Sequence, residues 1–293
     1  MNRILASLAL AGLALPALAA SPIDETRPLD PRGEVEVSNV KGSIEVRTWD
    51  RSEVRITGSL GDGVERLEIT GEGRRLGVRV RYPRNASSAE ATALVLEIPH
   101  QASLDVESVA ASVDVQGIAG DELGIDSVSG RITAVGAPRK ASIESVSGDQ
   151  RLNLNARDVD AESVSGKISL RGRIAGSVDV ESVSGDIDVD TRGERLGKLE
   201  VSTVSGDASV RTGIADGGRF GFESVSGDVR LALPRDVSAQ VEASTFSGDI
   251  QAPEANVVHK RYGPGASMEH RYGAGNASID IETFSGDVQL LLD

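Results

Sequence analysis

One tetrapeptide recurs through most of the chain and constrains its fold more than any other feature. The pattern Ser/Thr-Val/Phe-Ser-Gly occurs eight times between residues 127 and 286. The copies begin at Ser127, Ser145, Ser163, Ser182, Thr203, Ser224, Thr245 and Thr283, so successive copies are 18, 18, 19, 21, 21, 21 and 38 residues apart. A period of this length is typical of a solenoid, in which each repeat forms one coil that stacks on its neighbours. The last step spans about two periods, so we expect it to hold a degenerate copy or an insertion.

Within each repeat, apolar and polar residues alternate as they do in a β-strand. Val178 and Val180 alternate with acids, and after an odd step Val183, Ile187 and Val189 continue the alternation. Because an odd step reverses the apolar face of a strand, we expect a corner at the Glu-Ser pair before each Val or Phe. This interpretation turns the Val/Phe and the Gly of each tetrapeptide inward and its two hydroxyl residues outward.

We therefore predict an all-β fold, a β-solenoid that is similar to a single-stranded parallel β-helix, right-handed, with about 18–21 residues per coil. The alternative is an antiparallel meander or sandwich with Ser-Gly-Asp as a hairpin turn. Residues 34–100 repeat less well and are expected to form a β-rich cap, followed by the repeat solenoid at 101–293. The strands expected in the cap are Glu34–Val46, Glu53–Thr57, Arg66–Thr70, Arg75–Tyr82 and Ala93–Ile98.

Residues 1–19 have the pattern of a cleaved signal peptide. Arg3 precedes an apolar run from Ile4 to Leu15, and cleavage after Ala19 fits the small-residue rule, with Ala20 as the alternative. The run is shorter than the ~20 residues of a membrane-spanning helix, so we expect no transmembrane anchor in the mature chain. Residues 20–33 contain three prolines and are expected to form an extended leader without core residues. The chain is thus predicted to be exported, periplasmic or extracellular.

The composition excludes several classes of protein. The absence of Cys rules out disulfides, thiolate metal sites and Cys nucleophiles. With 31 basic and 45 acidic residues the net charge is -14, and only 3% of the residues are aromatic, which argues against nucleic-acid binding. We expect no cofactor.

The repeats resemble those of a known bacterial family. Tandem copies of Ser-Val-Ser-Gly-Asp-Ile-x-Val, together with the opening segment 37–46, are similar to the DUF4097 family of β-strand-repeat, "putative adhesin" proteins. The resemblance covers about residues 34–293. It implies a β-solenoid, and it supplies no catalytic residues.

The residue after each Gly forms one candidate binding surface. From the fourth copy onward this position is acidic in every coil, and the candidates for a divalent cation are Asp186, Asp207, Asp228 and Asp249. Stacked carboxylates repel one another and gain from a shared Ca²⁺. The alternative is a solvated acidic face that maintains solubility. Hydroxyl pairs such as Ser145 and Ser147 suggest an ice-binding array, against the alternative that these hydroxyls bond nearby backbone.

A second candidate surface lies in the 38-residue step, where basic, His and Tyr side chains cluster. These partner-binding candidates are His259, Lys260, Arg261, Tyr262, His270, Arg271 and Tyr272. Tyr and Arg are common interface anchors, and basic groups suit an anionic glycan or lipid head. The alternative is a hairpin insertion whose Tyr rings cover the end of the core.

No catalytic motif occurs in the sequence, and the acids recur in most repeats, which marks them as structural. We predict that the chain is not an enzyme and has no catalytic residues. It is expected to act as an adhesin-like binding or scaffolding module for an envelope component, whether glycan, lipid head or protein. The alternatives are a carbohydrate-active β-helix enzyme and a cation-dependent or ice-binding surface protein.

Overall fold

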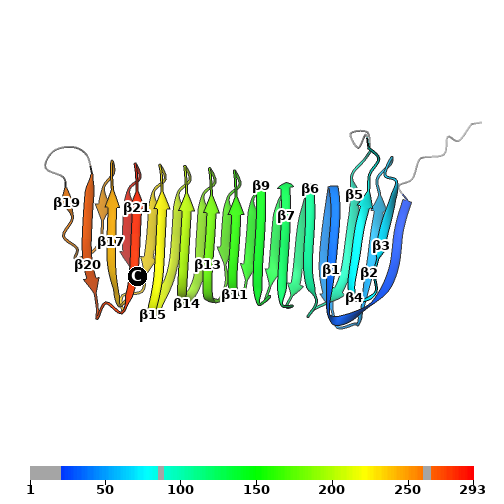
Figure 1. Cartoon of the computed structure of the whole chain (residues 1–293), viewed down its shortest axis with the longest axis horizontal. Helices are drawn as coiled ribbons and strands as arrows, with labels where there is room; N and C mark the ends of the chain where they lie inside the picture. The colour runs from blue at the N-terminus through cyan, green and yellow to red at the C-terminus, as the bar shows by residue number, and fades with distance from the viewer. Residues whose placement is uncertain (1–20, 85–88, 260–264) are drawn as a thin grey trace, which may run out of the picture.

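The computed structural model describes residues 21–84, 89–259 and 265–293. The chain forms a straight row of coils with a cap at its N-terminal end (Figure 1). No helix occurs in these three ranges. The predicted all-β solenoid is therefore confirmed, while its handedness stays a prediction. The predicted signal peptide lies outside the described residues.

The N-terminal end contains the five strands that the sequence predicts. They are β1 (Ser21–Trp49), β2 (Glu53–Leu60), β3 (Arg66–Thr70), β4 (Gly73–Arg81) and β5 (Thr92–Pro99). The long β1 pairs antiparallel with β2 and parallel with β4, β5 and β6 (Ser103–Ile118). Strand β1 therefore joins the cap to the first coil and supplies that coil with a partner.

The segment expected to be a leader takes part in this cap. Ser21–Pro28 pairs antiparallel with residues 53–60 of β2, and Ile23 and Leu29 are buried. The expectation that this segment lacks core residues is wrong. Its prolines exclude a helix, but they are compatible with a strand.

The solenoid consists of two rows of strands that pair in parallel from coil to coil. The first row holds β7 (Glu122–Ser129), β9 (Lys140–Ser147), β11 (Ala156–Ser163) and β13 (Ile174–Ser182). The second row holds β8 (Ile132–Gly136), β10 (Gln150–Leu154) and β12 (Ile168–Arg171). Both rows contain parts of β6, β14 (Ile187–Thr203) and β15 (Ala208–Ser224), which bend around the core. This parallel register excludes the antiparallel meander.

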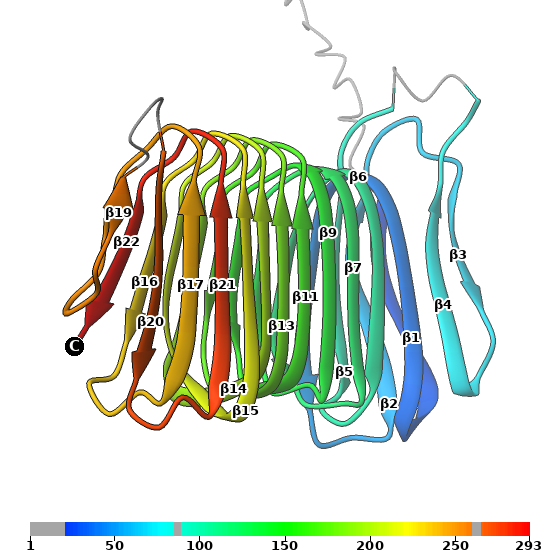
Figure 2. The same ribbon diagram turned by 60° about the vertical axis from the view of Figure 1, so that its left-hand side comes forward.

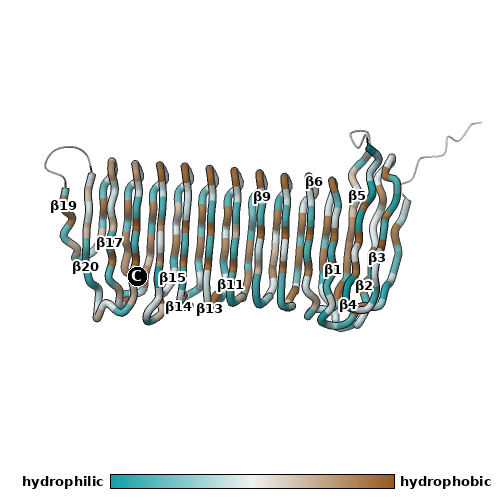
Figure 3. The backbone as a smooth tube through the Cα atoms, in the orientation of Figure 1, coloured by the Kyte–Doolittle hydropathy of each residue, from teal (hydrophilic) through white to brown (hydrophobic). Residues whose placement is uncertain are grey.

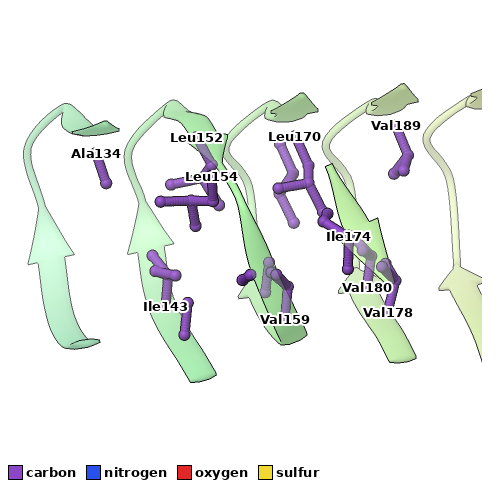
Figure 4. Close-up of a cluster of buried hydrophobic side chains, with 14 of the residues drawn as sticks. Ala134, Ile143, Leu152, Leu154, Val159, Leu170, Ile174, Val178, Val180 and Val189 are labelled. Carbon is purple, nitrogen blue, oxygen red and sulfur yellow. The ribbon is translucent and has the colours of Figure 1, made fainter. Parts of the chain in front are cut away.

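The core lies between the two rows, as the oblique view of the stack indicates (Figure 2). Ile143 and Val159 point inward from the first row, and Leu152 and Leu170 face them from the second (Figure 4). Each coil adds one such layer of branched aliphatic side chains. Because every layer lies against its neighbours, the core runs the length of the rod.

The corner of each coil lies two residues later than the sequence suggested. In β13 the inward alternation continues from Val180 to Ser182, after which Val183 and Ser184 both face outward and Gly185 is buried. The prediction for the Gly is confirmed. The outward position of the second hydroxyl is also confirmed. The predictions for the first hydroxyl and for the Val or Phe are wrong, because the first hydroxyl of each tetrapeptide is buried and the Val or Phe is exposed.

From the third copy to the sixth, a hydrogen bond explains why the hydroxyl residue and not the valine occupies the inside of the turn. The backbone N–H of Gly185 donates to Ser182 Oγ at 2.8 Å, and the N–H of Gly166 donates to Ser163 Oγ at 2.8 Å. A buried N–H needs such an acceptor, which valine cannot supply. The adjacent valine must then point to the outside of the corner.

The C-terminal end of the stack is closed by an insertion. Strand β17 (Ala239–Thr245) and the short β18 (Ile250–Gln251) form the last coil, and β21 (Ala277–Thr283) and β22 (Val288–Leu292) then return between it and the preceding strands, β15 and β16 (Val229–Leu233). Between them, β19 (Val258–His259) and β20 (Ala266–Tyr272) add an antiparallel edge on β17. The 38-residue step therefore holds this capping insertion.

Candidate functional site

A continuous groove of about 1110 Å³ follows the corners of the coils. Three residues of each coil line it: the residue before the first hydroxyl, that hydroxyl residue, and the Val or Phe that follows. We call this surface the corner groove. It extends from Ser38 in β1 to Ser244 in β17, so it crosses every coil of the solenoid.

One wall of the corner groove is a line of exposed apolar side chains, here called the apolar ladder. Its members expose between 46% and 57% of their surface. In spatial order they are Val109, Val128, Val146, Val164, Val183, Val204, Val225, Phe284 and Phe246. Figure 3 shows hydrophobic colour along this corner of the stack. The two Phe rings stack with their centroids 4.9 Å apart.

The opposite wall is a line of carboxylates, here called the acidic ladder. The strand register places these side chains on successive coils, apart from interruptions at Ser202 and Ser244. Its members are Glu107, Asp126, Glu144, Glu162, Glu181, Glu223 and Glu282. Within the described residues none of them forms a salt bridge. The wall thus carries charge that its own fold does not neutralise.

The crowding of this wall changes its titration. Burial, followed by the Glu107 carboxylate, raises the pKa of Asp126. Burial also raises the pKa of Glu162, with further contributions from Asp160, Glu144 and Glu181. Raised pKa values mean that the folded state disfavours these charges.

Neutralising one crowded carboxylate should therefore stabilise the protein. Because the pKa of Glu162 is higher in the folded chain than in the unfolded chain, ionisation of this group lowers stability as pH rises through that interval. We expect Glu162→Gln to raise Tm by about 1–3 °C at pH 7 and to leave it unchanged near pH ~3, where both states are protonated. Thermal unfolding followed by circular dichroism measures both values. The control is Glu122→Gln, since Glu122 lies opposite Lys140 and should gain nothing; an equal rise there would contradict the account.

The backbone N–H and C=O groups along the floor of the corner groove already form hydrogen bonds between neighbouring coils. The N–H of Val164 donates to Ser145 O at 3.1 Å, and the N–H of Ser165 donates to Val146 O at 3.0 Å. Ser165 Oγ donates to the same Val146 carbonyl at 3.3 Å, and this pattern repeats along the stack. A ligand in the groove must therefore be recognised by side chains.

These hydrogen bonds also change the reading of the hydroxyl residues. The first of each pair, such as Ser145, is buried, and the second, such as Ser147, donates to backbone. The flat double array suggested for ice binding therefore does not form. The alternative expected from the sequence, that corner hydroxyls bond nearby backbone, holds in most copies of the tetrapeptide, whereas Ser127 Oγ and Ser145 Oγ are buried without a hydrogen-bond partner among the described residues.

The residues after each Gly stack as expected, but their carboxylates have backbone partners. Asp186 Oδ1 accepts the N–H of Asp207 at 3.3 Å, and Asp207 Oδ1 accepts the N–H of Asp228 at 3.0 Å. The chain continues through Asp287 to Asp249 at 2.9 and 2.8 Å. Among the described residues no group of three or more His, Asp or Glu side chains is arranged to hold a metal ion. The carboxylates of Asp186, Asp207, Asp228 and Asp287 each accept an amide of the next coil, and Asp249 ends the chain as a donor.

The basic cluster of the insertion is only partly brought together. Tyr272 is 5% exposed, its hydroxyl donates to Pro253 O at 2.6 Å, and its ring meets that of His270 edge-on at 4.5 Å. Arg271 Nε donates to Gln240 Oε1 at 3.2 Å, while His259 is exposed. Lys260, Arg261 and Tyr262 lie outside the described residues. The burial of Tyr272 supports the alternative that this segment covers the core, and partner binding by the exposed members stays a prediction.

Sequence reasoning missed the apolar ladder, which runs through nine successive coils of the stack. The signal was present in the even spacing of Val178, Val180 and Ser182, which keeps the Ser on the inward face without any slip. The sequence interpretation placed every Val in the core and therefore did not recognise that the Val of each tetrapeptide faces outward.

Comparisons with known proteins agree with this fold. The family model "Toastrack DUF4097" matches residues 34–291. A crystal structure of a "putative adhesin" from Parabacteroides distasonis is 14% identical, with a TM-score of 0.52 over 93% of this chain and 98% of that one. A "putative lipid binding protein" from the same species is 13% identical, with a TM-score of 0.48 over 92% of this chain and 96% of that one. None of the curated proteins matches.

The described part of the chain holds no helix with the length and hydropathy of a membrane span. The similarity to the first of these structures supports the solenoid architecture alone.

Proposed function

The chain belongs to the Toastrack DUF4097 family, and on that premise we propose that it is an exported, non-catalytic, adhesin-like binding module of the cell envelope. The corner groove carries this proposal, because it exposes nine large apolar side chains in one line. Soluble proteins seldom leave so long an apolar surface uncovered unless it meets a partner. The partner is an envelope component that lies along the rod.

The form of the groove favours binding over catalysis. Catalysis needs different groups that converge on one reacting atom. Here the same three positions repeat in coil after coil, so the groove offers one uniform environment along its length. A repeated surface of this kind suits an elongated partner, for which many small contacts add up.

Co-sedimentation with isolated cell-envelope fractions tests the proposal. The mature chain should bind saturably, and the double variant Val146→Ser/Val164→Ser should bind at least about tenfold more weakly, because it removes two adjacent apolar contacts. The matched control is Val135→Ser/Val258→Ser, which changes two exposed valines that do not line the corner groove. Equal binding by both variants, or no binding by the unaltered chain, would refute the proposal.

The same assay with EDTA tests the aspartates that follow each Gly. Since the carboxylates of Asp186, Asp207 and Asp228 each already accept a backbone N–H, we expect EDTA to leave the binding unchanged. Loss of binding in EDTA would instead assign a cation-bridging role to Asp186, Asp207, Asp228 and Asp249.

A further inference from the structure

The corner groove also indicates which chemistry its partner has. We propose that it binds a basic amphipathic α-helix, with the apolar stripe of the helix on the apolar ladder and its Lys or Arg side chains on the acidic ladder. This inference rests on the proposed function, in that it takes the corner groove as the binding surface. It goes further by naming the partner's secondary structure, its charge and its orientation along the rod.

The hydrogen bonding of the groove floor determines the secondary structure of the partner. The amides of Val164 and Ser165 are both used between coils, and the Val146 carbonyl accepts from both an amide and a hydroxyl. An extended peptide laid across these corners would find no backbone partners. An α-helix forms its backbone hydrogen bonds within itself and presents only side chains. Its backbone N–H and C=O groups therefore lose no hydrogen bonds when the helix moves from water to this surface.

The spacing of the two ladders agrees with a helix. Neighbouring coils are about 4.8 Å apart, and the pitch of an α-helix is about 5.4 Å. Over the four steps from Glu107 to Glu181 the accumulated difference is roughly 2–3 Å, which long basic side chains can absorb. An extended strand repeats its face every ~6.7 Å and falls out of step within two coils.

Charge complementarity determines the sign of the partner. Five consecutive coils carry an acid, from Glu107 to Glu181, and within the described residues none of these acids has an ion-pair partner. Burial and like charges raise the pKa of Asp126 and of Glu162, so a cation beside either one would relieve a cost already present in the folded chain. The same wall repels an anionic membrane surface.

The two ends of the groove differ, which gives the partner a direction. The five-acid run lies toward the N-terminal cap and faces valines only. Toward the C-terminal insertion, Ser202 and Ser244 interrupt the acids and the stacked Phe284 and Phe246 replace valine. The basic half of the helix therefore lies near the cap, and its more apolar half lies on the two Phe rings.

A synthetic helix tests the inference directly. The probe is a fluorescent peptide of about 28 residues, long enough to follow the ~40 Å groove, with a Leu stripe, Lys beside the stripe in one half and Phe in the other. We expect saturable binding, a gain of helical circular dichroism on binding, and weakening of Kd as NaCl rises from ~50 to ~500 mM. The triple variant Glu144→Gln/Glu162→Gln/Glu181→Gln should raise Kd about tenfold.

The matched control removes three charges elsewhere. Glu65→Gln/Glu72→Gln/Glu122→Gln changes three exposed acids that do not line the corner groove, and it should leave Kd unchanged. A photo-crosslinker at the Lys end of the peptide should label the coils of Asp126 and Glu144. Labelling beside Phe246 instead would overturn the orientation.

Three results would overturn the inference itself. The first is no binding of the probe peptide, and the second is equal binding of a peptide with Glu in place of Lys. The third is that the protein binds phosphatidylglycerol vesicles more tightly than it binds the probe peptide. The envelope assay separates these failures from failure of the proposed function. If envelope binding still depends on Val146 and Val164 while the probe does not bind, the groove is a binding surface and only its assignment to a basic helix is wrong.

Discussion

Replacing Gly185 with alanine is expected to lower the free energy of unfolding by at least about 3 kcal/mol, and to leave much of the chain unfolded at 25 °C. A Cβ at this position would overlap the carbonyl oxygen of Gly166 in the preceding coil and lie 2.6 Å from its carbonyl carbon. Relief would require the two coils to separate. Hydrogen bonds on both sides resist that movement, from Val183 N to Ser163 O at 3.1 Å and from Ile168 N to Asp186 O at 2.9 Å.

The matched control for this substitution is Gly197→Ala. A Cβ at Gly197 would have only the Gly176 carbonyl oxygen near it, at an ordinary 3.5 Å. We expect its unfolding free energy to stay within about 0.5 kcal/mol of that of the unaltered chain. Urea unfolding followed by circular dichroism compares the two variants. Similar midpoints would mean that close approach of the coils does not explain the inward glycines.

The period and the alternation were sufficient to predict the architecture. An 18–21-residue repeat with short alternating runs has few solutions other than a stack of β-coils, and the strands expected in the cap lie close to the observed ones, except that the first begins at Ser21 and not at Glu34. The inward position of the Gly could also be predicted, since a corner that stacks on itself favours the residue without a side chain.

The inside of the corner could not be predicted from hydrophobicity. Burial of Ser182 and exposure of Val183 depend on the amide of Gly185, which needs an acceptor inside the turn. Buried residues are mostly apolar, but an apolar residue need not be buried, because much of a folded protein's surface is apolar. A hydrogen bond within a turn of four residues decided the orientation, and with it the location of the candidate site.

The candidate site was correspondingly harder to predict than the fold. The acids of the groove wall are visible in the sequence, but their significance depends on the apolar wall beside them. Tyr272 illustrates the opposite case. Its cluster is conspicuous in the sequence, yet the ring is buried and its hydroxyl bonds backbone, so it contributes to the cap.

The second large effect separates the buried and exposed valines of a single coil. Val180→Asp should cost about 4–5 kcal/mol or more, because it places an unpaired carboxylate in a layer that is fully buried. Val183→Asp makes the same chemical change three residues later, at a side chain that is 48% exposed. We expect it to cost less than about 1 kcal/mol, most of it from repulsion by the neighbouring acidic ladder. Val183→Ser should remove that repulsion and unfold like the unaltered chain.

Urea unfolding of the three variants gives the stabilities, and the envelope assay on the folded ones connects them to function. Val183→Asp should stay folded and lose binding, because it places a charge in the middle of the apolar ladder. If Val183→Asp unfolds as readily as Val180→Asp, the valine is part of the core and the corner groove does not exist in solution. If it folds and still binds the envelope, the groove exists but the partner lies elsewhere on the rod.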